Sequence, residues 1–225
     1  VRNVHQTHFK PRTKRIFRDT VRGLVATLGK IARDRRLLMY MLAYFFYIDG
    51  VHTIIKMSTS YGTDLGIDAT QLVLALLVTQ FVAFPCSIIY GKLAGRFGSK
   101  TMITAAVVAY MCIVFFAAFF LRAALEFWIL AILVGMFQGG IQALSRSYYG
   151  KIIPKDHANE YYGFYDIFGK TASIIGTFLV ATTTSLTGNA SIGVLSIAIL
   201  LAVALVFLLL QKDPTKGSTE AATVD

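Results

Sequence analysis

Three ionisable side chains interrupt the apolar stretch at residues 37–61: Asp49, His52 and Lys56. A helix turns about 100° per residue, so Asp49 and Lys56 point within roughly 20° of each other, with His52 close beside them. A charged group that faces lipid costs about 2.5–3.5 kcal/mol on insertion scales. The stripe must therefore face protein or a water-filled path. It could bind a substrate or a proton, and the alternative is a structural ion pair inside a helical bundle.

Two further ionisable residues, Asp166 and Lys170, are separated by about one helical turn. Residues at i and i+4 share a helix face, and Ser173 continues that face. The pair could belong to the same substrate or proton pathway. The alternative is an ion pair that is satisfied within one helix. A contact between Lys170 and Asp49 across a cavity is also compatible with the sequence.

Polar residues recur in a third apolar stretch, where Gln138 and Gln142 share a helix face and Arg146 adjoins it. The two glutamines could hydrogen-bond a substrate, or they could bond to neighbouring helices. Gly135 and Gly139 form a small-xxx-small pair, a spacing that lets a second helix approach closely. We expect these glycines to serve helix packing.

The elements that must position these side chains are membrane spans. Hydrophobic residues make up 56% of the chain and charged residues 15%, whereas a soluble domain has roughly 25% charged residues. Apolar stretches near the ~20 residues that a bilayer requires predict six transmembrane helices, and Asp68 predicts the N-cap of the second. The predicted fold class is an all-α membrane protein, half of a larger transporter bundle. We place the spans at 37–60, 71–91, 101–121, 127–149, 163–186 and 192–211.

A basic segment, residues 1–36, precedes the transmembrane domain at 37–211, and a short tail, 212–225, follows it. Between Lys14 and Arg36, apolar residues fall at helical spacing and basic residues occupy the other side. This pattern predicts an amphipathic helix in the membrane interface, in contact with anionic lipid. A nucleic-acid-binding arm is the alternative. We expect no nucleic-acid partner, because the helix runs straight into a span.

Lysine and arginine are distributed unequally among the links between spans. Residues 1–36 hold 11 of them, the links after spans two and four hold three and two, and the tail holds two. The links after spans one, three and five hold one, Arg122. Cytoplasmic loops carry the excess of these residues. The sequence therefore predicts an integral, multi-pass protein with both termini in the cytoplasm, and we expect it in the plasma (inner) membrane.

The link at residues 91–100 combines glycines, which permit a tight turn, with basic residues suited to a helix end. It resembles the cytoplasmic-loop signature of the major facilitator superfamily, G-x-x-x-D-R-x-G-R-[RK], at four positions: Gly91, Arg96, Gly98 and Lys100. Gly95 replaces the usual Asp, and Ser99 replaces the first of the two terminal basic residues. The resemblance implies a cytoplasmic loop gate, to which we assign the four matching residues and Arg146. A basic turn that only obeys the positive-inside rule is the alternative.

Two longer stretches, FFYIDGVHTII at 45–55 and QALSRSYYGKIIPKDHANEYYGFYDIFGK at 142–170, resemble the vacuole-effluxer-like family of major facilitators. This is the autophagy-related amino-acid exporter family of fungi, with bacterial relatives. The chain departs from the family pattern at two places. Ile48 stands where the family has Asn, and Gly176-Thr177 stands where it has Gly-Pro. The resemblance covers roughly residues 30–225 and implies the second six-helix half of a twelve-helix transporter, with amino-acid efflux described for fungal members. Its motif consists of Ser145, Arg146, Ser147, Pro154, Tyr162, Gly163, Phe164, Tyr165, Gly169 and Lys170.

Together these features predict half of a secondary transporter that exports a small, amino-acid-like solute by alternating access, with proton coupling as an option. Its partner would be an N-terminal six-helix half or a second copy. We expect the chain, which lacks an initiator Met, to begin within a longer protein or at a non-standard start codon. The alternative is a non-transporting membrane scaffold or lipid-interacting module that assembles with a partner.

Other kinds of chemistry are not indicated. The sequence has no phosphate-binding loop, no Gly-x-Ser-x-Gly elbow and no Ser/His/Asp set. The predicted spans hold no second His or Cys at metal-ligand spacing. We therefore expect no enzymatic activity, no cofactor and no metal site.

Overall fold

The structure, a computed structural model, describes residues 16–64, 66–155 and 158–211, and within these ranges it contains helices and no strand. Six spans are long and apolar enough to cross a membrane, with α6 and α7 together forming the fifth. The predicted all-α membrane fold is therefore confirmed. The helices are α1 (Ile16–Arg33), α2 (Arg35–Asp64), α3 (Ala69–Phe97), α4 (Ser99–Phe120), α5 (Ala124–Ile152), α6 (Ala158–Thr171), α7 (Ile174–Thr187) and α8 (Ala190–Leu210).

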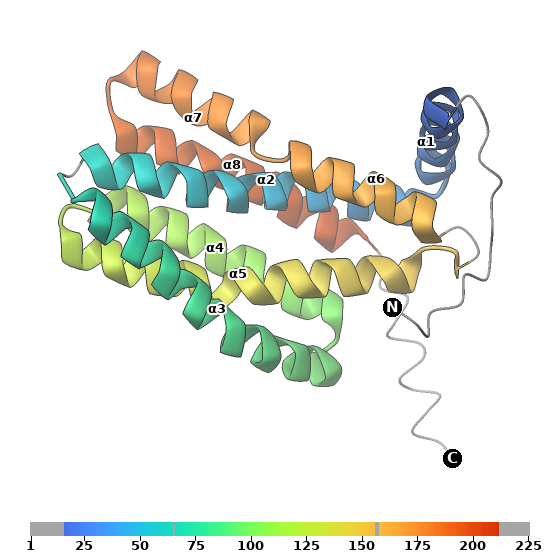
Figure 1. The fold of residues 1–225 in the computed structure, drawn as a ribbon, viewed down its shortest axis with the longest axis horizontal. Helices are drawn as coiled ribbons and strands as arrows, with labels where there is room; N and C mark the ends of the chain where they lie inside the picture. Colours follow the sequence, from blue (N-terminus) through green and yellow to red (C-terminus); the bar gives the residue numbers. More distant parts are fainter. Residues whose placement is uncertain (1–15, 65, 156–157, 212–225) are drawn as a thin grey trace.

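The spans run side by side, and α1 lies across one end of the bundle (Figure 1). At this end α2 begins, α3 turns into α4, α5 is linked to α6, and α8 ends. We call it the basic end, because its helix ends and links carry most of the Lys and Arg residues, whereas the links at the opposite end carry one, Arg122. Within the bundle α3 packs chiefly on α5, and α2 packs on α8.

Capping side chains and one glycine fix several helix ends. Asp68 Oδ2 accepts a 2.8 Å hydrogen bond from the Thr70 amide, which confirms the predicted N-cap of α3. Hydrogen bonds from Thr70 hold the pKa of the exposed Asp68 carboxyl below its ordinary value. Gly98 alone joins α3 to α4 with a φ of 87°, a conformation that favours glycine. The tight turn predicted within residues 91–100 is confirmed at this position.

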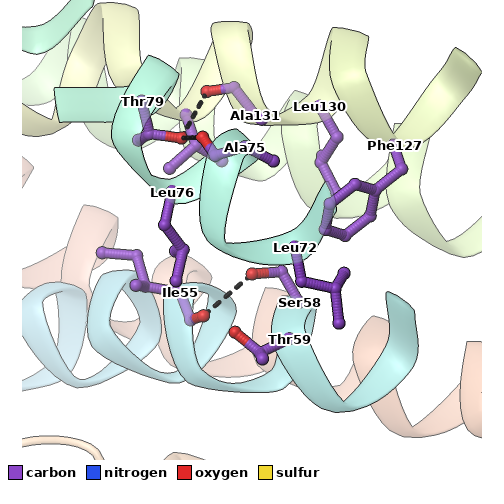
Figure 2. Close-up of a pocket in the computed structure, with 11 residues that line it drawn as sticks. Ile55, Ser58, Thr59, Leu72, Ala75, Leu76, Thr79, Phe127, Leu130 and Ala131 are labelled. Atoms are coloured by element: carbon purple, nitrogen blue, oxygen red, sulfur yellow. Dashed lines mark hydrogen bonds between the residues drawn. The ribbon is translucent and has the colours of Figure 1, made fainter. Parts of the chain in front are cut away.

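Two glycines bring α3 and α5 into close contact. A Cβ atom on Gly135 would lie 2.7 Å from the Thr79 carbonyl oxygen, and one on Gly139 would lie 2.6 Å from the Ala83 carbonyl oxygen. Thr79 Oγ1 also donates a 3.2 Å hydrogen bond to the Ala131 carbonyl on α5 (Figure 2). The predicted small-xxx-small contact is therefore confirmed, and it serves packing of α3 on α5.

The fifth span, predicted at residues 163–186, is present within Ala158–Thr187, but it contains a break that the sequence did not predict. α6 ends at Thr171, α7 begins at Ile174, and Ser173 between them has a φ of 85°, in the left-handed region. Figure 1 shows the interruption between the two orange helices. A broken helix is tolerated at membrane depth where neighbouring groups satisfy the freed backbone. Apolar spacing continues across the break, so periodicity alone did not reveal it.

The basic amphipathic helix predicted between Lys14 and Arg36 is present as α1, which packs on α2 and α6. Its inward face buries Thr27 and Ile31, while Val25 and Leu28 are exposed. Of the predicted terminal segments, residues 1–15 and 212–225 lie outside the described residues.

Candidate functional site

A cavity of about 360 Å³ opens between α2, α5 and α6. Its size falls within the range of roughly 300–1,000 Å³ that is usual for small-molecule sites. The lining residues of each helix are spaced at i and i+4, so they lie on one face of that helix. The lining residues are Tyr44, Ile48 and His52 of α2, Gln142 and Arg146 of α5, and Tyr165, Asp166, Gly169 and Lys170 of α6.

An ion pair joins two walls of this cavity. Arg146 Nη1 on α5 lies 2.8 Å from Asp166 Oδ1 on α6, with the two side chains 56% and 44% exposed. The Arg146 guanidinium also stacks over the Tyr162 ring, with 5.0 Å between the guanidinium carbon and the ring centroid. Asp166 therefore pairs across helices rather than with Lys170 on its own helix.

The cavity carries an excess of positive charge. Lys170 is exposed, and it has no ion pair or hydrogen bond among the residues that the structure describes. Because Arg146 and Asp166 neutralise each other, Lys170 leaves one uncompensated cation in the lining. His52 adds a partly buried imidazole on α2, and Gln142 adds an amide. The lining can therefore offer hydrogen-bond donors and a cation to an anionic group, and Asp166 to a cationic one.

The stripe of Asp49, His52 and Lys56 is divided by the fold. His52 lines the cavity, whereas Asp49 and Lys56 lie outside its lining. Asp49 is completely buried, and its Oδ2 accepts a 2.9 Å hydrogen bond from the Gly176 amide of α7. Lys56 Nζ donates a 2.6 Å hydrogen bond to Ser173 Oγ. Both residues therefore bond to the break between α6 and α7.

The two glutamines of α5 are also separated. Gln142 lines the cavity, but Gln138 lies outside the lining and is buried. Gln138 Oε1 has no hydrogen-bond partner among the described residues.

The proposed loop gate lies apart from the cavity at the basic end. Lys100 Nζ donates to the Gln211 carbonyl oxygen at the end of α8, and Lys151 Nζ donates a 3.1 Å hydrogen bond to Ser99 Oγ. These bonds tie the α3–α4 turn to the ends of α8 and α5. No atoms crowd the Cβ positions of Gly91 and Gly95 among the described residues. Arg146, which we grouped with this loop, lines the cavity. The Arg96 guanidinium stacks over the adjacent Phe97 ring.

Sequence reasoning missed a cluster of tyrosines between α2, α5 and α6. Tyr40 OH donates a 2.8 Å hydrogen bond to the Ser145 carbonyl, and Tyr47 OH lies 2.6 Å from Ser145 Oγ. The rings of Tyr44 and Tyr165 stack with centroids 4.1 Å apart. The signal was present, because tyrosines at 40, 44 and 47 follow the i, i+4, i+7 spacing of one helix face.

Other candidate sites are weaker. A second cavity of about 340 Å³ lies between α2, α7 and α8, and its lining contains no charged side chain. Among the described residues, no group of three or more His, Cys, Asp or Glu side chains could hold a metal ion.

Comparisons with known proteins find sequence relatives of this chain. A family model described as vacuole effluxer Atg22 like matches residues 1–222. The chain is 51% identical over 215 residues to an uncharacterized MFS-type transporter, YxiO, of Bacillus subtilis, covering 96% of this chain and 50% of that protein. It is 27% identical over 197 residues to autophagy-related protein 22 of Cryptococcus neoformans, covering 80% of this chain and 34% of that protein. The match to autophagy-related protein 22 of Saccharomyces cerevisiae is 28% identical over 163 residues and covers 68% and 31%. The chain thus spans half of the first relative and about a third of the others.

Proposed function

Because the chain belongs to the vacuole effluxer Atg22-like family, we propose that it is one six-helix half of a secondary transporter. A small solute would move through it by alternating access, as two helix bundles rock around a site near the midplane. One observation carries this proposal: Arg146, Asp166 and Lys170 gather around a 360 Å³ cavity between α2, α5 and α6. Ionisable groups at membrane depth are costly and commonly mark a solute or ion pathway.

We propose an amino-acid-like solute, moved outward. An amino acid carries a carboxylate and an ammonium group, and the cavity offers a partner for each. Arg146 and Lys170 can bind the carboxylate, and Asp166 can accept from the ammonium. The description of the matching family, vacuole effluxer Atg22 like, agrees with efflux. Proton coupling is part of the proposal, with Asp49 as its site.

We propose that the cavity is completed by a second six-helix bundle, either an N-terminal half or a second copy. Among the described residues, α2, α5 and α6 supply the lining of the 360 Å³ cavity, and the second bundle would cover its open side. We also propose that the basic end faces the cytoplasm, because the Lys and Arg residues are concentrated there.

The test is efflux by the product of the complete reading frame, reconstituted in liposomes loaded with a mixture of labelled amino acids. Arg146→Ala and Lys170→Ala should each slow efflux about tenfold or more, the scale expected when a charged substrate contact is lost. Lys155→Ala is the matched control, because Lys155 is exposed and lies outside the cavity. Equal rates for all three variants would remove the cavity from the transport path.

Lipid contact by α1 is a second candidate function with its own support. Val25 and Leu28 are 63% and 46% exposed, beside the exposed Lys30 and Arg33. Near an anionic membrane surface each basic side chain contributes about 1 kcal/mol of binding. The protein should therefore unfold at higher temperature in anionic than in zwitterionic nanodiscs. The double variant Lys30→Gln/Arg33→Gln should lose that difference if α1 binds anionic lipid.

A further inference from the structure

We propose that Asp49 is a proton-binding site that fastens α2 to the break between α6 and α7, and that a proton bound there loosens this joint. The inference rests on the proposed transport function and deepens it. It assigns the coupling site to the joint beside the cavity, because Asp49 lies outside the cavity lining.

The first step is the position of the Asp49 carboxylate at the start of α7. Ser173, the N-cap residue, makes no side-chain capping hydrogen bond. Asp49 Oδ2 supplies that acceptor from another helix, 2.9 Å from the amide of Gly176, the third residue of α7. The first amides of a helix lack internal partners and form the positive end of its dipole. The ionised carboxylate therefore holds α7 against α2.

The second step is the unused oxygen of the same carboxylate. Asp49 Oδ1 is buried and has no hydrogen-bond partner among the described residues, and the same is true of Thr53 Oγ1 one turn later. A carboxylate has two acceptor oxygens, and leaving one unsatisfied away from water costs free energy. A proton on Oδ1 removes the buried negative charge and leaves the bond to Gly176 in place as a weaker, neutral contact.

The third step is that α2 holds the joint over two turns. A Cβ atom on Gly176 would collide with the Thr53 side chain, so the backbone of α7 lies directly on α2. Lys56 Nζ bonds to Ser173 Oγ, the residue with the left-handed backbone. Asp49 and Lys56 therefore hold this joint from the same face of α2.

The groups that could compete for this role are few. Beside Lys56, the titratable side chains near the joint are those that line the adjacent cavity: Tyr44 and His52 on α2, Arg146 on α5, and Tyr165, Asp166 and Lys170 on α6. The described helices α7 and α8 carry no Asp, Glu, His, Lys or Arg. Asp49 is therefore the one carboxylate bonded to the backbone of the joint among the described residues.

The fourth step connects the joint to the solute. α6 supplies Asp166 and Lys170 to the cavity wall, and Lys170 lies three residues before Ser173. While Asp49 is ionised, α7 is fastened to α2 and the end of α6 is fixed with it. When Asp49 is protonated, the weaker cap lets α6 shift against α7 and moves these two cavity residues. Proton binding and solute binding would then be coupled through this joint.

The test uses two readouts on the purified chain, neither of which requires transport. Infrared difference spectra between neutral and acidic pH should show the C=O band of a protonated carboxylic acid that Asp49→Asn removes. Hydrogen exchange should show the amides at 174–177 exchanging about tenfold faster at acidic pH, after correction for the intrinsic rate, because the charged cap is weakened. Asp49→Asn should show the faster exchange at both pH values.

Glu126→Gln is the matched control, since Glu126 Oε2 also accepts a hydrogen bond from an amide at a helix start, that of Ala123, but this bond is exposed to solvent. This variant should keep the infrared band of the protonated carboxyl and the faster exchange of amides 174–177 at acidic pH. If the exchange rates at 174–177 in the wild-type protein do not depend on pH, the proposal is overturned. It is also overturned if Asp49→Asn keeps the pH-dependent increase in exchange rate. If exchange at 174–177 depends on pH but the reconstituted protein moves no solute, the assignment of Asp49 to the joint is supported and the proposed transport function is rejected.

Discussion

Arg146 Nη1 lies 2.8 Å from Asp166 Oδ1, and this pair joins α5 to α6 across the cavity. The two side chains neutralise each other while about half of each remains exposed. A zwitterionic solute could therefore replace each partner with its own opposite charge without leaving a buried charge unpaired. The pair can therefore hold α5 and α6 together and still exchange its partners for the charged groups of a ligand.

The geometry of Arg146 is the first target. Arg146→Lys keeps the charge but loses the planar guanidinium that bonds Asp166 and stacks over Tyr162. We expect efflux to fall about tenfold, while the free energy of unfolding changes by less than about 1 kcal/mol, because half-exposed ion pairs contribute little. Initial efflux rates and thermal unfolding of the same preparations measure both effects. A large loss of stability with unchanged efflux would make the pair structural.

The close contact between α3 and α5 predicts that adding a methyl group at a contact glycine lowers the free energy of unfolding. Gly139→Ala places a Cβ atom against the Ala83 carbonyl oxygen, which is backbone and cannot rotate away. We expect a loss of about 1–3 kcal/mol, the usual cost of overpacking. Gly95→Ala is the control on α3, because its Cβ would meet open space, and it should be neutral or stabilising by about 0.5–1 kcal/mol. Thermal unfolding in detergent distinguishes them, and equal effects would contradict the packing role.

The parts of this fold that the sequence predicts are those set by local patterns. Apolar length predicts all six spans, and the spacing of Gly135 and Gly139 predicts a close helix contact. Each of these two predictions depends on a single stretch of the chain and on the spacing of residues within it. The partner helix of those glycines, α3, could not be read from their spacing, since any backbone could fill the same groove.

The arrangement of the site depends on contacts between distant residues. A helical wheel relates Asp166 to Lys170 on the same helix, yet the structure pairs Asp166 with Arg146 on another. Asp49 bonds to Gly176, 127 residues along the chain, at a helix break that the apolar pattern does not reveal. The wheel identified which residues share a face, but helix packing decides which face meets the cavity and which meets the joint.

The N-cap of α3 gives a prediction for pH. Hydrogen bonds from Thr70 lower the pKa of Asp68 in the folded protein, so its ionised carboxylate stabilises the fold above its ordinary pKa. That contribution is lost as the pH falls through the lowered pKa. Asp68→Asn keeps an acceptor for the Thr70 amide but does not titrate. The difference in unfolding temperature between wild type and Asp68→Asn should therefore shrink on acidification; a difference that is independent of pH would contradict this role.

The uncompensated charge of Lys170 predicts which solutes the cavity prefers. Removing this cation in Lys170→Gln should raise the half-saturation concentration for acidic and zwitterionic amino acids about tenfold, because a charge-assisted hydrogen bond is worth about 1.5–3 kcal/mol. Basic amino acids should be affected less or should compete better, since the variant cavity no longer repels them. Competition between labelled and unlabelled amino acids in the reconstituted protein measures both effects in one assay. Lys155→Gln, at an exposed position outside the cavity, should leave every constant unchanged. If Lys170→Gln weakened acidic, neutral and basic solutes equally, Lys170 would act through the shape of the cavity and not through its charge.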